Sequence, residues 1–171
     1  GDRSELLSDV DLSAVATIVH TSGSTGQPRP AAHTLNNHLY SARGANDNIP
    51  LGPGDRWLLS LPLYHVGGLA ILFRCLISGA AVVVPDHRDN LGAAIEQFDA
   101  THVSLVATQL QRLLSARTST GTSLRAVLLG GSRIPNTLIR RAVDRNFPIH
   151  VSYGSTEMSS QITTTPPGAS L

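Results

Sequence analysis

The sequence contains no lysine, and this absence limits the chemistry that the chain can perform alone. All 13 basic residues among its 171 are arginines. Any reaction step that depends on a lysine side chain must therefore come from outside this chain. The basic residues are nearly balanced by 12 acidic ones, for a net charge of +1. This balance gives no reason to expect binding to nucleic acid or to an anionic membrane.

Cysteine is almost absent as well, and long hydrophobic runs do not occur. Cys75 is the only cysteine, which excludes a disulfide framework and a CxxC metal site, and we expect it to lie in the core. No apolar run approaches the roughly eighteen residues of a membrane-spanning helix. Residues 1–11 are polar and acidic, unlike a signal peptide. We therefore expect a soluble, cytoplasmic protein.

Short apolar runs alternate with amphipathic stretches along most of the chain. The predicted strands are residues 15–19, 56–60, 80–84, 102–106, 125–129 and 149–152, with 161–165 as one more possible strand. The predicted helices are residues 31–43, 66–77, 91–98, 109–115 and 136–145. Several strands are continuously apolar, as a parallel sheet covered on both faces requires. We predict a doubly wound α/β fold with a mostly parallel sheet.

The predicted elements divide the chain into three parts. Residues 1–14 form a lead-in, and residues 15–165 form one α/β core. Residues 166–171 contain two prolines and a glycine, and we expect them to be a linker to a further portion.

A segment rich in hydroxyls and glycine follows the first predicted strand. It consists of Thr21, Ser22, Gly23, Ser24, Thr25 and Gly26, and Arg29 follows shortly after. Glycine permits positive φ, so backbone N–H groups can converge on one point, while hydroxyls and a guanidinium add donors and charge. The segment fits neither a Walker A loop nor GxGxxG. We predict a phosphate-binding loop, with a polar surface turn as the alternative.

Polar or glycine-rich residues follow five of the predicted strands. These segments are residues 21–26, 61–65, 108–109, 130–132 and 153–157. Ligands of doubly wound sheets bind beyond the carboxyl ends of the strands. The sequence therefore predicts that the five segments line one cleft.

Three of these segments resemble the core motifs of the adenylate-forming acyl-CoA synthetases, in the same order. They are Thr21 to Gly26, Leu61-Pro62-Leu63-Tyr64-His65 and Tyr153-Gly154-Ser155-Thr156-Glu157. Residues 57–66, 104–110 and 126–132 are further similar to the family of o-succinylbenzoate-CoA ligases of menaquinone biosynthesis. The resemblance extends from about residue 17 to residue 165.

The resemblance implies an AMP-forming acid-CoA ligase that uses ATP and Mg²⁺. In such an enzyme a small carboxylate, here o-succinylbenzoate, attacks the α-phosphate of ATP, and coenzyme A then displaces AMP from the acyl-adenylate. Attack at phosphorus depends on positioning and fixed positive charge more than on a protein base. Another acyl- or aryl-CoA synthetase or adenylation domain, and a non-catalytic nucleotide-binding module, are the alternatives.

The resemblance also assigns nucleotide-binding residues. The loop from Thr21 to Gly26 would bind the β- and γ-phosphates with Arg29, which would also act in catalysis. The remaining nucleotide-binding residues would be Gly131, Ser132, Tyr153, Gly154 and Thr156, with Tyr153 stacked on adenine. Glu157 would bind Mg²⁺, which prefers hard oxygen ligands alongside phosphates. A solvated glutamate and a core tyrosine are the structural alternatives for Glu157 and Tyr153.

The acyl site would be formed by His65, Arg74, Thr108, Gly130 and Ser155. By the resemblance His65 would lie beside the reacting carboxylate, steering it and helping to exclude water. Arg74 interrupts the most apolar predicted helix, and burying it unpaired is costly, so it must find an anion or reach solvent. The resemblance implies a second substrate carboxylate as that anion, and an internal salt bridge is the alternative. The other histidines show no metal-ligand spacing.

Two departures from the family pattern affect the expected activity. The loop of the family ends in Pro-Lys-Gly, whereas this chain has Pro28-Arg29-Pro30, which replaces the lysine and stiffens the backbone. The family's ribose-binding aspartate, its hinge and its C-terminal domain with the adenylation lysine have no counterpart in these residues. We therefore expect weak or no ligase activity from this chain alone.

Overall fold

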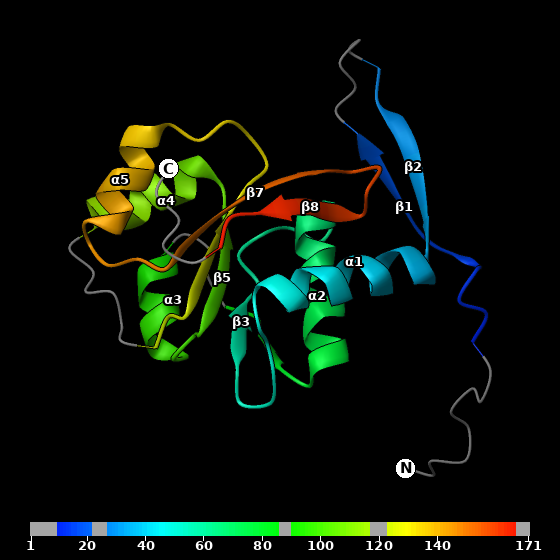
Figure 1. Ribbon diagram of the computed structural model, residues 1–171, viewed down its shortest axis with the longest axis horizontal. Helices are drawn as coiled ribbons and strands as arrows, with labels where there is room; N and C mark the ends of the chain where they lie inside the picture. The colour runs from blue at the N-terminus through cyan, green and yellow to red at the C-terminus, as the bar shows by residue number, and fades with distance from the viewer. Residues whose placement is uncertain (1–9, 22–26, 86–89, 117–122, 167–171) are drawn as a thin grey trace.

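The computed structural model describes residues 10–21, 27–85, 90–116 and 123–166 (Figure 1). Its elements are β1 (Val15–Thr21), β2 (Arg29–Thr34), α1 (Leu35–Asn48), β3 (Arg56–Leu58), α2 (Val66–Ser78), β4 (Ala81–Val83), α3 (Leu91–Gln97), β5 (His102–Leu105), α4 (Ala107–Ser115), β6 (Ala126–Leu129), α5 (Asn136–Val143), β7 (Ile149–Ser155) and β8 (Ser160–Thr164). Among these residues, no helix combines the length and the apolar character that a membrane span requires.

The main sheet has six strands in the order β4-β3-β5-β6-β7-β8. Its first five strands are parallel, and β8, the further strand that the sequence suggested, pairs antiparallel with β7. The chain winds outward from β3 in both directions, with β4 on one side and β5, β6 and β7 on the other. The predicted doubly wound, mostly parallel α/β fold is confirmed.

Helices cover both faces of the sheet. Successive residues of each strand point to opposite faces, so neighbouring side chains pack in different cores. Leu58 faces α3, α4 and α5 and packs in the larger core, whereas its neighbour Trp57 faces α2 and packs with Ile71 and Cys75. In Figure 1, α3, α4 and α5 lie on one side of the strands and α2 lies on the other. Cys75 is buried as expected, and burial raises the pKa of its thiol to about 11.

The first predicted strand does not belong to the main sheet. β1 pairs antiparallel with β2 in a separate two-stranded sheet. Residues 29–34 are therefore strand, and the prediction that the first helix begins at residue 31 is wrong. The helix begins after Thr34, whose hydroxyl oxygen accepts the Asn37 N–H at 3.2 Å while the Asn37 side chain accepts the Thr34 N–H at 2.8 Å. This reciprocal cap fixes the start of α1.

The other predicted elements agree with the structure in kind and differ at their ends. α1 continues to Asn48, five residues beyond its predicted end at residue 43, and α4 begins at Ala107 rather than at residue 109. The Gln109 side chain accepts the Val106 N–H at 3.0 Å, which secures this earlier start. α2 ends at Ser78, one residue beyond its predicted end at residue 77, and Gly79 after it adopts the left-handed conformation with φ of 74°.

Candidate functional site

A cavity of about 540 Å³ lies beyond the carboxyl ends of the parallel strands. Its wall includes residues that follow four of these strands, namely Pro62 after β3, Val106 and Gln109 after β5, Gly130 and Gly131 after β6, and Ser155 and Thr156 at the end of β7. Residues of α1 and α2, His20 of β1 and residues 159–161 also line it. The predicted convergence of polar segments is confirmed for four of the five. Of the fifth, residues 22–26 lie outside the described residues.

Glycines at two strand ends allow the backbone segments of this wall to approach closely. A Cβ atom on Gly130 would lie 2.6 Å from the Ser152 hydroxyl oxygen, and one on Gly154 would lie 2.0 Å from the Ser160 carbonyl oxygen. Both distances are shorter than a nonbonded contact allows. Position 154 therefore requires glycine because the neighbouring atom is backbone, whereas a side chain at position 130 would displace the Ser152 hydroxyl.

Arg74 lies in the cavity wall, and polar groups of α1 hold most of its guanidinium. Its Nε donates to Asn46 Oδ1 at 2.8 Å, and its Nη2 donates to the carbonyl oxygens of Ala45 at 3.2 Å and Ile49 at 3.1 Å. The guanidinium carbon lies 4.2 Å from the centre of the Trp57 ring. These contacts orient the charged group rigidly within the fold.

One nitrogen of Arg74 has no partner. The residue is only 2% exposed, and its Nη1 is buried without a hydrogen bond. Within the described residues the ion pairs are Arg56–Asp99 and Arg125–Asp55, so the expected alternative of an internal salt bridge to Arg74 is wrong there. Burial lowers the pKa of Arg74 to about 10, so the group stays charged at neutral pH. A buried donor left unpaired costs about 1–3 kcal/mol, which an acceptor bound in the cavity would recover.

Two further buried polar atoms without partners belong to residues of the same cavity wall. They are Ser159 Oγ and Gln161 Oε1. Sequence reasoning missed both residues, and it missed Asn46 and Trp57 as well. Trp57 is the only tryptophan and lies four positions before Leu61, where the segment 61–65 begins, which is a usable signal. Asn46 reads as a turn residue, and only the structure reveals its contact with Arg74.

His65 lies at the entrance to α2, where it lines the cavity. It occupies the N-cap position, its side chain makes no capping hydrogen bond, and its ring centre lies 4.7 Å from that of Tyr64. The amino end of a helix carries partial positive charge and favours an anion nearby. An acyl carboxylate beside His65 would therefore meet a favourable field. Gly130, Gly131, Gly154, Ser155 and Thr156 line the same cavity.

The remaining predicted site residues lie outside the cavity wall, so their assigned roles stay predictions. Thr108, Ser132, Tyr153 and Glu157 are exposed, Arg29 is exposed at the start of β2, and Thr21 is half-buried at the end of β1. Ser22, Gly23, Ser24, Thr25 and Gly26 fall outside the described residues.

Glu157 has the character expected of a magnesium ligand. Hydrogen bonds from its own N–H and from the Ser155 side chain lower the pKa of its carboxyl group, so the carboxylate stays ionised. No group of three or more His, Cys, Asp or Glu side chains in the described part of the chain could hold a metal ion. A Mg²⁺ ion at Glu157 would take further oxygen ligands from a bound phosphate and from water, which is how Mg²⁺ commonly binds.

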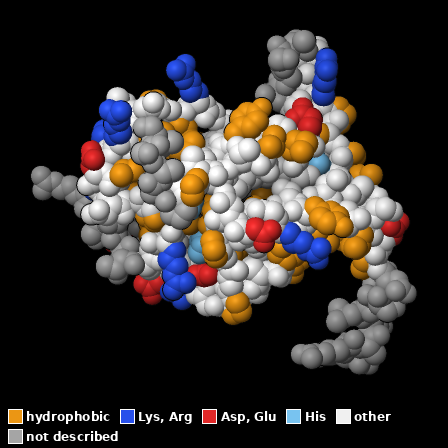
Figure 2. Space-filling model, viewed as in Figure 1, with side chains coloured by type: hydrophobic (Ala, Val, Ile, Leu, Met, Phe, Trp, Pro, Cys, Tyr) orange, Lys and Arg blue, Asp and Glu red, His pale blue; other side chains and the backbone are white. Residues whose placement is uncertain are grey.

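Charged side chains are dispersed over the face of the molecule shown in Figure 2. The described arginines on this face form no continuous basic stripe, and exposed hydrophobic and acidic side chains lie between them. A nucleic-acid interface would present clustered basic groups. This arrangement agrees with the near-neutral charge of the sequence.

Comparisons with known proteins identify relatives along almost the whole chain. The sequence profile of the family described as "AMP-binding enzyme" matches residues 3–170. The chain is 42% identical over 165 residues to 2-succinylbenzoate--CoA ligase of Bacillus pumilus. The matched region covers 95% of this chain and 34% of that protein.

Solved structures show the same architecture. Escherichia coli MenE, with a bound m-phenylether-linked analogue of OSB-AMS, is 39% identical and has a TM-score of 0.85, covering 94% of this chain and 35% of that one. Bacillus subtilis o-succinylbenzoate coenzyme A synthetase (MenE), in complex with ATP and magnesium ion, is 37% identical with a TM-score of 0.84, covering 92% and 34%. The chain thus spans about one third of the length of the relatives that it matches.

Proposed function

The chain belongs to the AMP-binding enzyme family, and we propose that it is the nucleotide- and acyl-binding core of an AMP-forming acid-CoA ligase. The proposed acid is o-succinylbenzoate, which carries two carboxylates. ATP and coenzyme A are the proposed co-substrates, and Mg²⁺ is the proposed metal ion. The names of the relatives and the ligands bound to the solved structures support this choice.

The unpaired Nη1 of Arg74 is the observation that carries the proposal. A buried, charged donor in a cavity wall is costly unless an acceptor forms a hydrogen bond with it. The substrate carboxylate that does not react would supply this acceptor, while the reacting carboxylate would lie toward His65. Both residues come from α2 and its N-cap, and both line one cavity, so one dicarboxylate can contact them together.

The nucleotide would occupy the mouth of the cavity near the end of β7. We assign Gly131, Ser132, Tyr153, Gly154 and Thr156 to its adenosine part, with Thr108, Gly130 and Ser155 toward the acyl group. The phosphates would meet Arg29 and residues 21–26, and Glu157 would share Mg²⁺ with them. Bound Mg²⁺ would neutralise phosphate charge, while the chain's own groups orient the carboxylate for attack at phosphorus.

The complete reaction is proposed for a longer protein than this chain. The chain spans about one third of its relatives and contains no lysine, so we expect it to bind and align the reactants with weak or no turnover. These two observations also favour a second candidate, a nucleotide-binding module without catalysis. The proposed partners are small molecules, and the proposed compartment is the cytoplasm.

A matched pair of ligands tests the proposal through Arg74. One is an acyl-sulfamoyl-adenosine that carries a free second carboxylate, and the other is its methyl ester. We expect the wild-type chain to bind the free acid about 100-fold more tightly, since a charged hydrogen bond in a dry pocket separates the two ligands. Calorimetry gives the affinities, and a rise in Tm reports binding to the folded chain.

Arg74→Gln supplies the control, because glutamine can still bond Asn46 but carries no charge. This variant should bind the two ligands equally while its thermal unfolding stays cooperative. Equal affinities in the wild type would contradict the dicarboxylate assignment. Failure of both ligands to bind would contradict the ligase function as well.

A further inference from the structure

His33 joins two parts of the molecule that are 123 residues apart in the chain. It lies on β2, is 2% exposed, and forms a hydrogen bond of 2.6 Å between its Nε2 and the carbonyl oxygen of Thr156. A carbonyl oxygen can only accept, so Nε2 carries the hydrogen and donates it. The other ring nitrogen, Nδ1, is buried without a partner. The Thr156 carbonyl is therefore the polar group that this ring binds.

The Thr156 carbonyl belongs to the turn that carries Glu157. The Ser159 N–H donates to the same oxygen at 3.1 Å, which closes the turn between β7 and β8. The C=O of Thr156 and the N–H of Glu157 form one planar peptide group, so fixing the oxygen also fixes the N–H. The same planar group includes the Cα of Glu157, so the point from which its side chain leaves the backbone is fixed as well. The placement of the carboxylate thus depends on the peptide that His33 holds.

Neighbouring rings keep His33 in place. The ring centre of His38 lies 5.4 Å from that of His33, and His38 in turn stacks on Phe73 of α2 at 4.4 Å. His38 Nε2 also contacts the Thr17 hydroxyl on β1 at 2.8 Å. Among the described residues, no other hydrogen bond joins the β1–β2 hairpin to the turn of residues 156–159. Within the described part of the chain, the His33–Thr156 bond is thus the hydrogen bond that ties this turn to the hairpin.

We propose that His33 is a positioning residue for the bound magnesium ion, because it holds the Thr156–Glu157 peptide in the orientation that presents the Glu157 carboxylate. The inference rests on the proposed function, in which Glu157 binds the Mg²⁺ of MgATP. His33 itself does not line the cavity. Its effect on magnesium passes through the backbone carbonyl of residue 156. Every amino-acid type at that position keeps this carbonyl, so the contact depends on His33 and not on the Thr156 side chain.

Two amide substitutions separate this role from mere packing. The side-chain nitrogen of glutamine can reach the position of Nε2, whereas that of asparagine reaches only the position of Nδ1. His33→Gln can therefore donate to Thr156 and His33→Asn cannot, although both place a polar amide in the same buried site. The measurement is the affinity of the 171-residue chain for ATP, by calorimetry, with and without Mg²⁺.

We expect Mg²⁺ to strengthen ATP binding in the wild type and in His33→Gln. In His33→Asn this magnesium effect should fall about tenfold, the equivalent of one strong hydrogen bond. Binding of ATP without Mg²⁺ should be similar in all three proteins. The double variant His33→Asn/Glu157→Gln should show no smaller magnesium effect than Glu157→Gln alone, since both changes act on the same carboxylate.

The outcomes distinguish the two proposals. If the wild type binds MgATP and Glu157→Gln loses the magnesium effect while His33→Asn retains it, the positioning role is wrong and the proposed function stands. An equal loss in His33→Gln and His33→Asn also overturns the role, because the donor would not matter. If the wild type does not bind MgATP at all, the proposed function itself is overturned.

Discussion

At the amino edge of the main sheet the buried carboxylate of Asp55 is paired through both oxygens, whereas at the carboxyl edge Arg74, Ser159 and Gln161 each keep a buried polar atom without a partner. Both edges are hollowed, with a cleft of about 480 Å³ at the amino edge and a cavity of about 540 Å³ at the carboxyl edge. The volume of the hollow therefore does not distinguish the two edges. They differ in whether the buried polar groups of the wall have hydrogen-bond partners.

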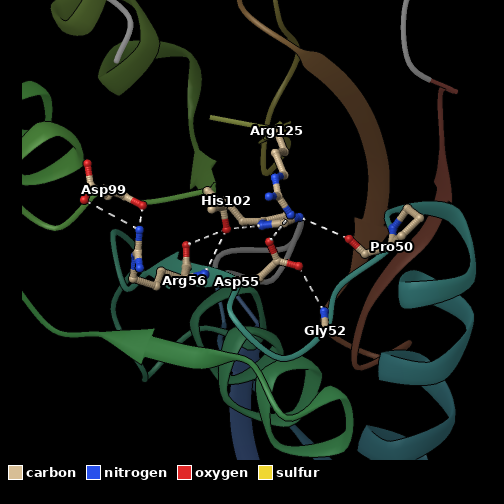
Figure 3. Close-up of polar contacts among 8 residues, drawn as sticks. Pro50, Gly52, Asp55, Arg56, Asp99, His102 and Arg125 are labelled. Carbon is tan, nitrogen blue, oxygen red and sulfur yellow. Dashed lines mark hydrogen bonds and ion pairs between the residues drawn. The ribbon is translucent and has the colours of Figure 1, made fainter. Parts of the chain in front are cut away.

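Figure 3 shows the amino edge, which we call the paired edge because its buried carboxylate has partners at both oxygens. Arg125 Nη1 donates to Asp55 Oδ1 at 2.8 Å, and the Gly52 N–H donates to Asp55 Oδ2 at 3.0 Å. His102 lies beside them, with Nε2 3.2 Å from the Pro50 carbonyl oxygen and Nδ1 2.8 Å from the Thr101 hydroxyl. Both Asp55 oxygens and both His102 ring nitrogens thus have partners within the fold. We interpret this edge as structural, and the carboxyl edge as the binding edge.

Trp57 lies between the two edges and contacts both. Its ring centre is 4.2 Å from the Arg74 guanidinium carbon and 5.0 Å from the centre of the His102 ring. Its Nε1 donates to the Ser104 hydroxyl at 3.2 Å, and the residue is fully buried. A change at Trp57 should therefore impair stability and ligand preference together.

Trp57→Ala is expected to have the largest effect. Loss of a fully buried indole should lower the free energy of unfolding by about 4 kcal/mol, from lost burial and the cavity left behind. The platform under Arg74 is lost as well, so the preference for the free-acid ligand over its ester should shrink. Urea unfolding and calorimetry measure the two effects.

Trp57→Phe is the matched control, since it keeps an aromatic face for Arg74 and loses only the Ser104 hydrogen bond and some volume. We expect a cost of about 1–2 kcal/mol with the ligand preference retained. If Trp57→Ala left that preference intact, the stacking would not orient Arg74, and the two edges would be independent.

Periodic apolar runs predicted most of the fold, because burial on both faces of a parallel sheet leaves a local pattern. The five parallel strands and the segments that follow them could be located in this way, and with them most of the cavity wall. The β1–β2 pairing could not, since Ala31 and Ala32 are compatible with helix and strand alike. Their state is decided by pairing with β1 and by the cap at Thr34.

The contacts that define the site join residues that are distant in the sequence. Asn46 contacts Arg74 across 28 positions, and His33 contacts Thr156 across 123. Neither residue carries a local pattern that indicates its partner. The sequence located Arg74 because a charge in an apolar helix is costly, but its unpaired nitrogen depends on which acceptors the fold supplies.

Acidification should lower the free energy of unfolding through His102 at the paired edge, by less than Trp57→Ala does. Burial lowers the pKa of His102 to about 4, below the ordinary value of 6.5 that the unfolded chain recovers. Between these values the unfolded state binds more protons, so stability is full above pH 6.5 and declines as the pH falls toward 4. The loss from this residue should reach up to about 3 kcal/mol.

Urea unfolding at a series of pH values, for the wild type and His102→Gln, measures this loss. Glutamine can still donate to the Pro50 carbonyl but does not titrate, so its stability should vary less over the same pH range. Burial lowers the pKa of His38 and His150 in the same direction, and these residues remain in the variant. Identical pH profiles for the two proteins would show that His102 does not account for the acid sensitivity.

Removal of one hydroxyl from each edge should give the smallest effect and the sharpest contrast. The Ser159 hydroxyl is buried without a partner, so Ser159→Ala removes a group that contributes no hydrogen bond. We expect a change within about 0.5 kcal/mol. The Thr101 hydroxyl instead accepts the Arg56 N–H at 2.9 Å and contacts His102, so Thr101→Val, which keeps the shape, should cost about 1–2 kcal/mol. Because both residues are buried, equal costs in urea unfolding would mean that the unpaired state of the carboxyl edge has no energetic consequence, and the contrast between the edges would fail.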